Sequence, residues 1–147
     1  MKRLFTLLMV AVIALASIAC SDPSATRTIS VNGGSYMWLT PAQFNEFISD
    51  ESVYLINVDE VYAGEIKRGN QQGGTNLFLG ASKISANLDK MPSDKATKIA
   101  VYCANGLSSQ DGAALLVKAG YTNVAELNGG LAAWNNQGYQ SITKASS

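Results

Sequence analysis

Hydrophobic and polar residues alternate along the chain in blocks that predict strands and helices in turn. Two nearly continuous apolar runs rich in β-branched residues, 53–58 and 98–102, are typical of strands buried on both faces. A shorter run at 123–127 predicts another strand. Helical patterns over 109–119 and 131–137 follow the last two runs, and each ends at a glycine. This alternation predicts an α/β domain: a doubly wound parallel sheet of about five strands with helices on both faces.

An earlier helix is predicted by its start signal. Thr40 is a good N-cap, Pro41 suits the first helical position, and Gln43 completes a capping box. The helix should present Phe44 on its apolar face and end before the polar residues 49–52.

The segment 67–80 lacks a hydrophobic period and contains separate glycines. It predicts a long surface insertion in which Leu77, Phe78 and Leu79 pack locally. Loops of this length are often functional lids, so we expect either a lid or a docking surface here.

The N-terminus has the features of a secretory signal. Lys2 and Arg3 precede an apolar run, 4–16, that is too short to span a membrane. The small residue Ala19 stands before Cys20, as in the lipobox of bacterial lipoproteins, whose cysteine becomes acylated. We therefore expect a signal peptide over 1–19 and a lipid anchor on Cys20. The alternative is a soluble secreted protein cleaved near Ala19.

Ser21, the residue after the expected lipid anchor Cys20, indicates in which membrane the protein is anchored. In such lipoproteins Ser21 favours the outer membrane, so we expect a cell-envelope protein that faces the periplasm. Residues 20–36 are small and polar, which predicts an acylated cysteine and flexible tether, with a short strand possible over 28–31. The folded domain should then span 37–139, with a C-terminal tail at 140–147.

Composition excludes several classes of protein. The 147 residues are 47% hydrophobic and 15% charged, which suits one compact domain. Eleven basic and eleven acidic residues balance, so no basic face predicts a nucleic-acid partner. The chain has no His, which excludes serine triads, Cys-His dyads and His-ligated metal sites. We expect neither a metal nor an organic cofactor.

Cys103 is the residue best placed for chemistry. It ends a predicted buried strand, and a short loop leads from it into a helix near Ser109. Ligands of open α/β sheets bind at the carboxyl ends of strands. Helix N-terminal N–H groups favour a thiolate and would also hold an oxyanion such as thiosulfate, and Gly106 lets the backbone curl around it. The alternative is a free cysteine packed as a small hydrophobic residue.

Three segments of the chain match the sequence pattern of one protein family: VYLINVDEVYAGEI, VYCANGLSS and AALLVKAGYTNVAELNGGLAAWNNQGY. Cys103, Gly106 and Ser109 match the active loop Cys-x-x-Gly-x-Arg-Ser of rhodaneses. Seven downstream residues also fall in that family's register: Leu116, Gly120, Tyr121, Val124, Gly129, Gly130 and Trp134. The chain therefore resembles a single rhodanese-like (sulfurtransferase) domain over about residues 37–139. We interpret Trp134 and the paired glycines as core packing and a turn.

The resemblance implies an activity. Rhodaneses carry a sulfane sulfur on the cysteine as a persulfide and pass it to cyanide or a thiol, without metal or cofactor. Cys103 would be the nucleophile, the donor a small sulfur-containing anion or a persulfide, and the acceptor a thiol or a protein. The substrate-binding loop would be Ala104, Asn105, Gly106, Leu107, Ser108 and Ser109, whose N–H groups would hold the persulfide and the departing charge.

Three positions depart from the family pattern. Ser108 occupies the slot of the loop arginine, and Asn57 and Asp59 stand where the family has Asp and Arg. A hydroxyl is a weaker anion donor than a forked guanidinium, so weak thiosulfate turnover is expected. Lys67 or Arg68 could supply the missing cation, although a solvated surface pair is the favoured interpretation.

Two other classes of function compete with sulfur transfer. One is a catalytically weak or idle rhodanese-like binding module anchored to the membrane, which the three departures favour. Another is a cysteine phosphatase or arsenate reductase, disfavoured because residues 69–147 contain no arginine. A thioredoxin-like oxidoreductase is also disfavoured, since Cys103 has no CxxC partner.

Overall fold

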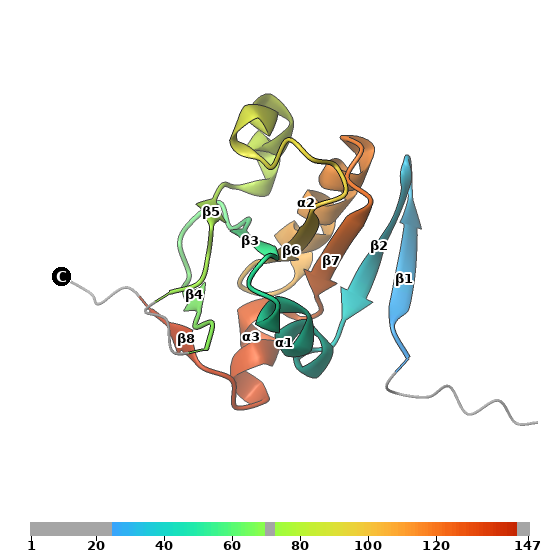
Figure 1. The fold of residues 1–147 in the computed structure, drawn as a ribbon. Coiled ribbons are helices and arrows are strands. Elements are labelled where there is room, and N and C mark those ends of the chain that lie inside the picture. The colour runs from blue at the N-terminus through green and yellow to red at the C-terminus, as the bar shows by residue number, and fades with distance from the viewer. Residues whose placement is uncertain (1–24, 70–72, 144–147) are drawn as a thin grey trace, which may run out of the picture.

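The computed structural model describes residues 25–69 and 73–143, which form an α/β domain around a six-stranded sheet (Figure 1). The strand order is β1-β2-β7-β6-β3-β5, and a separate two-stranded sheet joins β4 to β8. The strands are β1 (Arg27–Val31), β2 (Gly34–Leu39), β3 (Tyr54–Asn57), β4 (Glu65–Ile66), β5 (Leu77–Phe78), β6 (Lys98–Tyr102), β7 (Asn123–Leu127) and β8 (Ser141–Ile142). The helices are α1 (Pro41–Ser49), η1 (Ala81–Ala86), η2 (Leu88–Lys90), α2 (Leu107–Lys118) and α3 (Gly130–Asn136).

The predicted fold class is confirmed. Strands β2, β7, β6, β3 and β5 are parallel, and β1 adds an antiparallel strand at the edge. The central strands β3, β6 and β7 are buried for most of their length, as their apolar runs predict. Parallel pairing places the carboxyl ends of all five strands at one edge of the sheet, and this edge carries the site described below.

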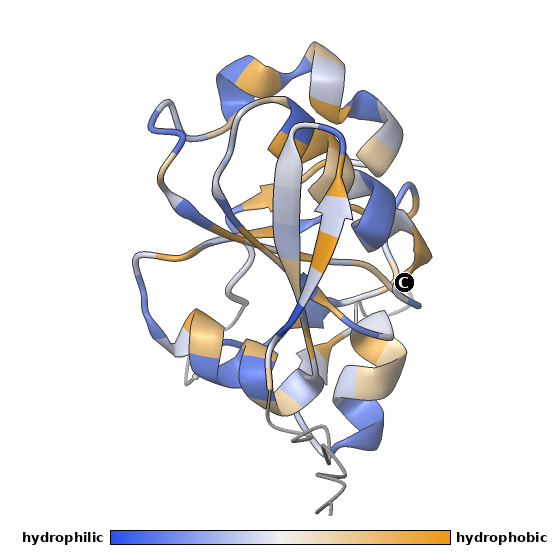
Figure 2. Ribbon diagram, turned by 90° about the vertical axis from the view of Figure 1, so that its right-hand side faces the viewer, coloured by the Kyte–Doolittle hydropathy of each residue, from blue (hydrophilic) through white to orange (hydrophobic). Residues whose placement is uncertain are grey.

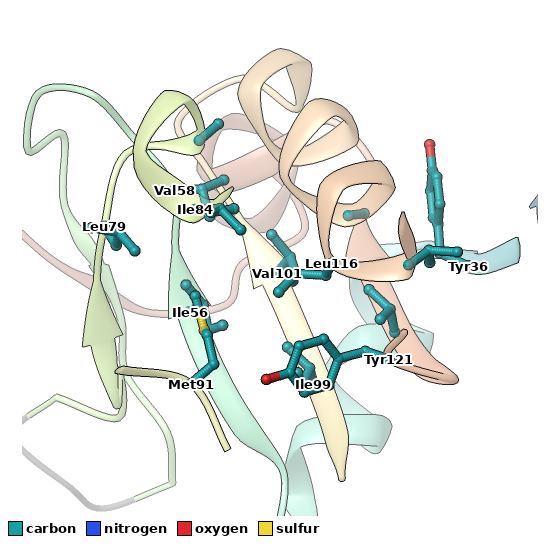
Figure 3. Packing of buried hydrophobic residues seen from close by; sticks show 14 of the residues in the cluster. Tyr36, Ile56, Val58, Leu79, Ile84, Met91, Ile99, Val101, Leu116 and Tyr121 are labelled. Atoms are coloured by element: carbon teal, nitrogen blue, oxygen red, sulfur yellow. The ribbon is translucent and has the colours of Figure 1, made fainter. Parts of the chain in front are cut away.

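Helices cover both faces of the sheet and divide the core in two. One cluster packs α2 and η1 on the sheet and includes Ile84, Val101 and Leu116 (Figure 3). The other packs α1 and α3 on the opposite face and includes Phe44 and Trp134, whose rings meet edge to face. In Figure 2, where the β1–β2 hairpin faces the viewer, hydrophilic residues mark the outer sides of the helices.

The helix signals predict the helix ends closely. Thr40 caps α1, and both halves of the capping box with Gln43 form. α2 ends as expected, with Gly120 left-handed at φ +98°. Its start differs from prediction: α2 begins at Leu107 instead of Ser109, because the left-handed turn at Gly106 (φ +86°) directs the next residue into the helix.

The short strand that the sequence allowed over 28–31 is present, inside the segment predicted as a tether. Arg27–Val31 pairs with Gly34–Leu39 as an antiparallel hairpin whose turn places Gly33 at φ +98°. Ile29 and Val31 pack against the first cluster, which explains why this polar-looking segment folds. The rest of the predicted tether, Cys20 and the signal peptide over 1–19 lie outside the described residues.

The insertion and the tail contribute secondary structure that was not predicted. Leu77–Phe78 pairs with β3 in parallel, so part of the segment 67–80 extends the sheet. Ser141–Ile142, in the predicted C-terminal tail, pairs with Glu65–Ile66. Across residues 25–69 and 73–143, no helix is both long and apolar enough to cross a bilayer.

Candidate functional site

Cys103 lies directly after β6, at the carboxyl edge of the sheet, and its sulfur is enclosed by the loop that follows. The N–H of Gly106 donates to Sγ at 3.1 Å and the N–H of Ser109 at 3.3 Å. These two donors come from the turn and the first residues of α2, so the helix N-terminus points at the sulfur. Such an arrangement stabilises a thiolate or a persulfide anion. The Cys103 side chain is 0% exposed.

The start of α3 holds the loop from the other side. Leu131 N–H donates to the Cys103 carbonyl at 2.9 Å, and Ala132 N–H donates to the Ala104 carbonyl at 3.0 Å. With their carbonyls bound to α3, these peptide units are held in a single orientation. The paired glycines are thus more than a turn, because Gly129 and Gly130 allow α3 to approach the loop closely.

Two of the three departures from the family pattern build a further support. Asp59 Oδ1 accepts the N–H of Ala104 at 2.9 Å, and Asn57 Oδ1 accepts the N–H of Asp59 at 2.8 Å. Asn57 is buried and also donates to the Gly64 carbonyl at 2.9 Å. The N–H of Ala104 is therefore already bonded, which differs from the expectation that it would bind substrate. The same holds for Leu107, whose N–H donates to Asn105 Oδ1 at 3.0 Å.

Ser109 links the sulfur to a buried acid. Its Oγ lies 3.4 Å from Cys103 Sγ and donates to Glu126 Oε1 at 2.6 Å. Glu126 is in β7 and is 0% exposed, and burial raises the pKa of its carboxyl to about 7. Sequence reasoning missed Glu126. The signal that could have found it is an acidic residue inside an otherwise apolar strand.

Ser108, in the first turn of α2, has no hydrogen bond to the Cys103 sulfur among the described residues. It lies beside the loop that follows Cys103, called the sulfur loop below. It lines a shallow hollow between α2 and η1, together with Glu60, Ala81, Ser82, Asp111, Ala114 and Leu115. Leu107 is 68% exposed at the same edge. The hollow contains two carboxylates and no basic residue, so it is a poor place for a dianion.

Lys67 and Arg68 do not supply the missing cation. The Arg68 guanidinium donates to the carbonyls of Ile48, Asp50 and Val53, which precede β3 at the amino edge of the sheet, opposite Cys103. Lys67 donates to Gln140 Oε1. Within residues 25–69 and 73–143, no lysine or arginine side chain bonds to the Cys103 loop.

Among protein-family models, that of the rhodanese-like domain matches residues 40–137. A tRNA uridine(34) hydroxylase from Teredinibacter turnerae is 31% identical over 97 residues, which cover 64% of this chain and 29% of that protein. This chain therefore spans less than a third of that relative.

Solved structures share the fold. A rhodanese-related protein from Thermoplasma volcanium has a TM-score of 0.57 at 22% identity, covering 72% of this chain and 97% of that one. A thiosulfate sulfurtransferase from Pseudomonas aeruginosa has a TM-score of 0.56 at 21% identity, covering 73% of this chain and 20% of that one. Both likenesses concern the arrangement of the sheet and its helices.

Proposed function

Since the chain belongs to the rhodanese-like domain family, we propose that it transfers sulfane sulfur through a persulfide on Cys103. The observation that carries the proposal is the pair of N–H groups, from Gly106 and Ser109, that converge on Sγ. They stabilise negative charge on sulfur whether it belongs to the attacking thiolate or to the finished persulfide. A cysteine that served only as a core residue would not need two amide donors.

The transfer involves two displacements at sulfur. In the first, the Cys103 thiolate attacks the outer sulfur of a donor R–S–SH, a new S–S bond forms, and R–S⁻ leaves with the electrons of the old S–S bond. In the second, an acceptor thiolate attacks the outer sulfur of Cys103–S–SH, the acceptor becomes a persulfide, and the Cys103 thiolate returns. With cyanide as acceptor the product is thiocyanate. The cycle requires no external oxidant or reductant.

The charges at the site favour a persulfide donor over thiosulfate. Thiosulfate is a dianion whose departing sulfite needs a cationic partner, but Ser108 occupies the arginine slot and Glu60 and Asp111 face the adjacent hollow. A persulfide carries at most one charge on its sulfurs and leaves as a thiolate. We therefore assign a persulfide as the main donor and thiosulfate as a weak one.

The hydroxylase activity named for the Teredinibacter relative does not transfer directly. That protein is more than three times the length of the matching segment, and the segment corresponds to the rhodanese-like part of this chain. The match covers 29% of that protein, so its whole activity is not assigned to this chain.

A second candidate function is a binding module without turnover. The observation that favours it is the complete burial of Cys103, which gives a donor no direct line to the sulfur in this conformation. Under this alternative the loop would serve as a rigid surface for a partner, and Cys103 would be a structural acceptor for two N–H groups.

We further propose that Cys20 is the lipid anchor and that the domain faces the periplasm from the outer membrane. Mass spectrometry of the N-terminal peptide from membranes tests this, with Cys20→Ser as the control. A diacylglyceryl-modified Cys20 supports the proposal. An unmodified peptide beginning at Cys20 would identify a soluble secreted protein instead.

The test of sulfur transfer uses the full chain carrying Cys20→Ser, in which Cys103 is the only cysteine. The reduced protein is incubated separately with thiosulfate and with glutathione persulfide, and its intact mass is measured. We expect the mass of one added sulfur with the persulfide, its absence in Cys103→Ala, and its loss on addition of cyanide or a thiol. No adduct from either donor, with Cys103 titrated as reduced, would reject transfer in favour of the binding module.

A further inference from the structure

A continuous chain of donors leads from the reactive sulfur into the sheet. Cys103 Sγ lies 3.4 Å from Ser109 Oγ, closer than to its other acceptor, Asn105 Oδ1 at 3.9 Å, and Ser109 Oγ donates to Glu126 Oε1 at 2.6 Å. The three side chains come from the residue after β6, the first turn of α2 and the next-to-last position of β7. All three are 0% exposed, so the line is shielded from bulk solvent.

Glu126 is energetically costly at this place, because its carboxyl is buried inside a strand of mostly buried residues. It pairs in register with Val101 on one side and Trp38 on the other. Its second oxygen, Oε2, is buried and has no hydrogen-bond partner among the described residues. A buried, half-satisfied carboxyl usually destabilises a fold, so its position behind the reactive cysteine suggests a functional use.

Burial opposes the ionisation of Glu126. Burial raises the pKa of the nearby Tyr36 in β2, and the charges of Glu126 and of Asp111 in α2 raise it further. From β6 the facing titratable group is Cys103 itself. Among the described residues, no cation bonds to Glu126. Its carboxyl therefore changes protonation near neutral pH, with burial as the main cause and the Ser109 hydrogen bond acting against it.

We propose that Glu126 takes the proton of Cys103 through the Ser109 hydroxyl and so generates the nucleophilic thiolate. Glu126 acts here as a positioning residue, because it does not touch the reacting sulfur. The inference rests on the proposed sulfur transfer and adds its proton step. It also gives this chain, which lacks His and the loop arginine, an internal base for its cysteine.

The step balances within the three side chains. The S–H bond of Cys103 breaks and its proton bonds to Ser109 Oγ, while the former hydroxyl proton of Ser109 bonds to Glu126 Oε1. The products are a thiolate, an intact serine and a neutral carboxylic acid, with one negative charge before and after. The thiolate keeps the N–H groups of Gly106 and Ser109 as donors.

The first test needs no sulfur donor. The thiolate absorbance of the full chain carrying Cys20→Ser is titrated from about pH 5 to about pH 9, with Cys103→Ala subtracted to remove the tyrosines. We expect two steps, the first near neutral pH, because Cys103 and Glu126 together hold two protons at low pH and lose them one after the other. Glu126→Gln, which keeps the shape but cannot ionise, should give a single step.

The second test is the rate of persulfide loading across the same pH range. We expect Glu126→Gln and Ser109→Ala each to lower the rate at neutral pH by about 10- to 100-fold and to remove the inflection near neutral pH. Glu126→Asp should restore that inflection in part. Glu46→Gln removes an exposed carboxylate from α1 and should leave the profile unchanged. Circular dichroism confirms that each variant is folded.

The outcomes separate this inference from the proposed function. If Glu126→Gln loads sulfur with the wild-type pH profile, or faster at every pH, Glu126 does not serve as the base and the inference is rejected while transfer stands. A wild-type profile in Ser109→Ala rejects the serine bridge. A third outcome is that Glu126→Gln reduces the two titration steps to one while no donor loads sulfur on the unsubstituted site. That outcome would support the proton step and reject sulfur transfer.

Discussion

Gly130 lies directly against Cys103, and its lack of a side chain allows α3 to hold the sulfur loop. A Cβ on Gly130 would overlap the Cys103 carbonyl oxygen and would lie 2.7 Å from Gly106 N and 2.8 Å from the Ala104 carbonyl carbon. The residue is also left-handed, at φ +59°. The close approach lets the N–H groups of Leu131 and Ala132 bond to the loop carbonyls. Loop geometry thus depends on a contact between segments far apart in the sequence.

Gly130→Ala should therefore disturb both stability and the site. The left-handed backbone and the overlap with backbone atoms, which cannot move away, should cost at least about 2 kcal/mol of unfolding free energy. Persulfide loading of Cys103 should also fall, because the loop must shift. Urea unfolding and intact-mass loading measure the two effects. Gly138→Ala is the matched control: φ is +82° but nothing lies within 4 Å, so a loss of about 1 kcal/mol with normal loading is expected. Equal effects in the two variants would contradict this role of Gly130.

Restoring the missing guanidinium should shift donor preference. In Ser108→Arg, a charged, forked donor stands at the hollow beside the sulfur loop, and thiosulfate loading should rise about tenfold, the effect of one charge-assisted hydrogen bond. Loading from glutathione persulfide should change less, because its leaving thiolate carries less charge. Thiocyanate formation from each donor gives the ratio. Ser108→Gln, a neutral donor of similar length, should leave the ratio near the wild-type value, and a thiosulfate rate unchanged by the arginine would show that the acidic hollow dominates.

Burial of Glu126 should make the folded domain less stable as pH rises. Burial raises the pKa of this carboxyl from 4.5 to about 7, so the native state holds the proton more tightly than the unfolded state. The free energy of unfolding therefore falls progressively as the pH rises from 4.5 to about 7, by about 3 kcal/mol in all. Asp50 acts in the opposite sense: hydrogen bonds from Ser52 and Lys98 lower its pKa, which affects stability only in more acidic solution. Urea midpoints at about pH 5 and about pH 8 measure the loss. Glu126→Gln should remove most of it, and an equal loss in that variant would assign the effect to another group.

Arg68 should matter for folding and leave the sulfur chemistry unchanged. Its guanidinium satisfies the carbonyls of Ile48, Asp50 and Val53, so Arg68→Ala should cost about 2 kcal/mol. Persulfide loading should stay normal because these contacts lie at the opposite edge of the sheet from Cys103. Thermal unfolding and intact-mass loading provide the two readouts. Lys67→Ala removes a neighbouring cation with one bond, to Gln140, and should cost less than about 0.5 kcal/mol. Loss of loading in folded Arg68→Ala would place this arginine at the site after all.

The elements that the sequence predicted well are those whose signals are local. The capping box of Thr40 and Gln43 closes within one turn, and the buried strands at Lys98–Tyr102 and Asn123–Leu127 are long enough for their apolar runs to be read directly. Of the hairpin at Arg27–Leu39, the sequence allowed only a short strand over 28–31, because the polar composition of the segment resembles a linker. Its stability comes from pairing with the sheet and packing on the first cluster, and neither contact is visible in a short window of sequence.

By itself, the sequence determined the α/β class and the family, and it pointed to Cys103 as the candidate nucleophile, since spacing within one strand, loop and helix is a property of neighbouring residues. Tertiary structure alone decided which groups surround that sulfur. Glu126, Asp59 and Gly130 are separated from Cys103 by 23, 44 and 27 positions, and their contacts with its loop exist only because parallel strands end at one edge of the sheet. The same topology placed Arg68 at the other edge, where its charge supports the backbone and cannot reach the site.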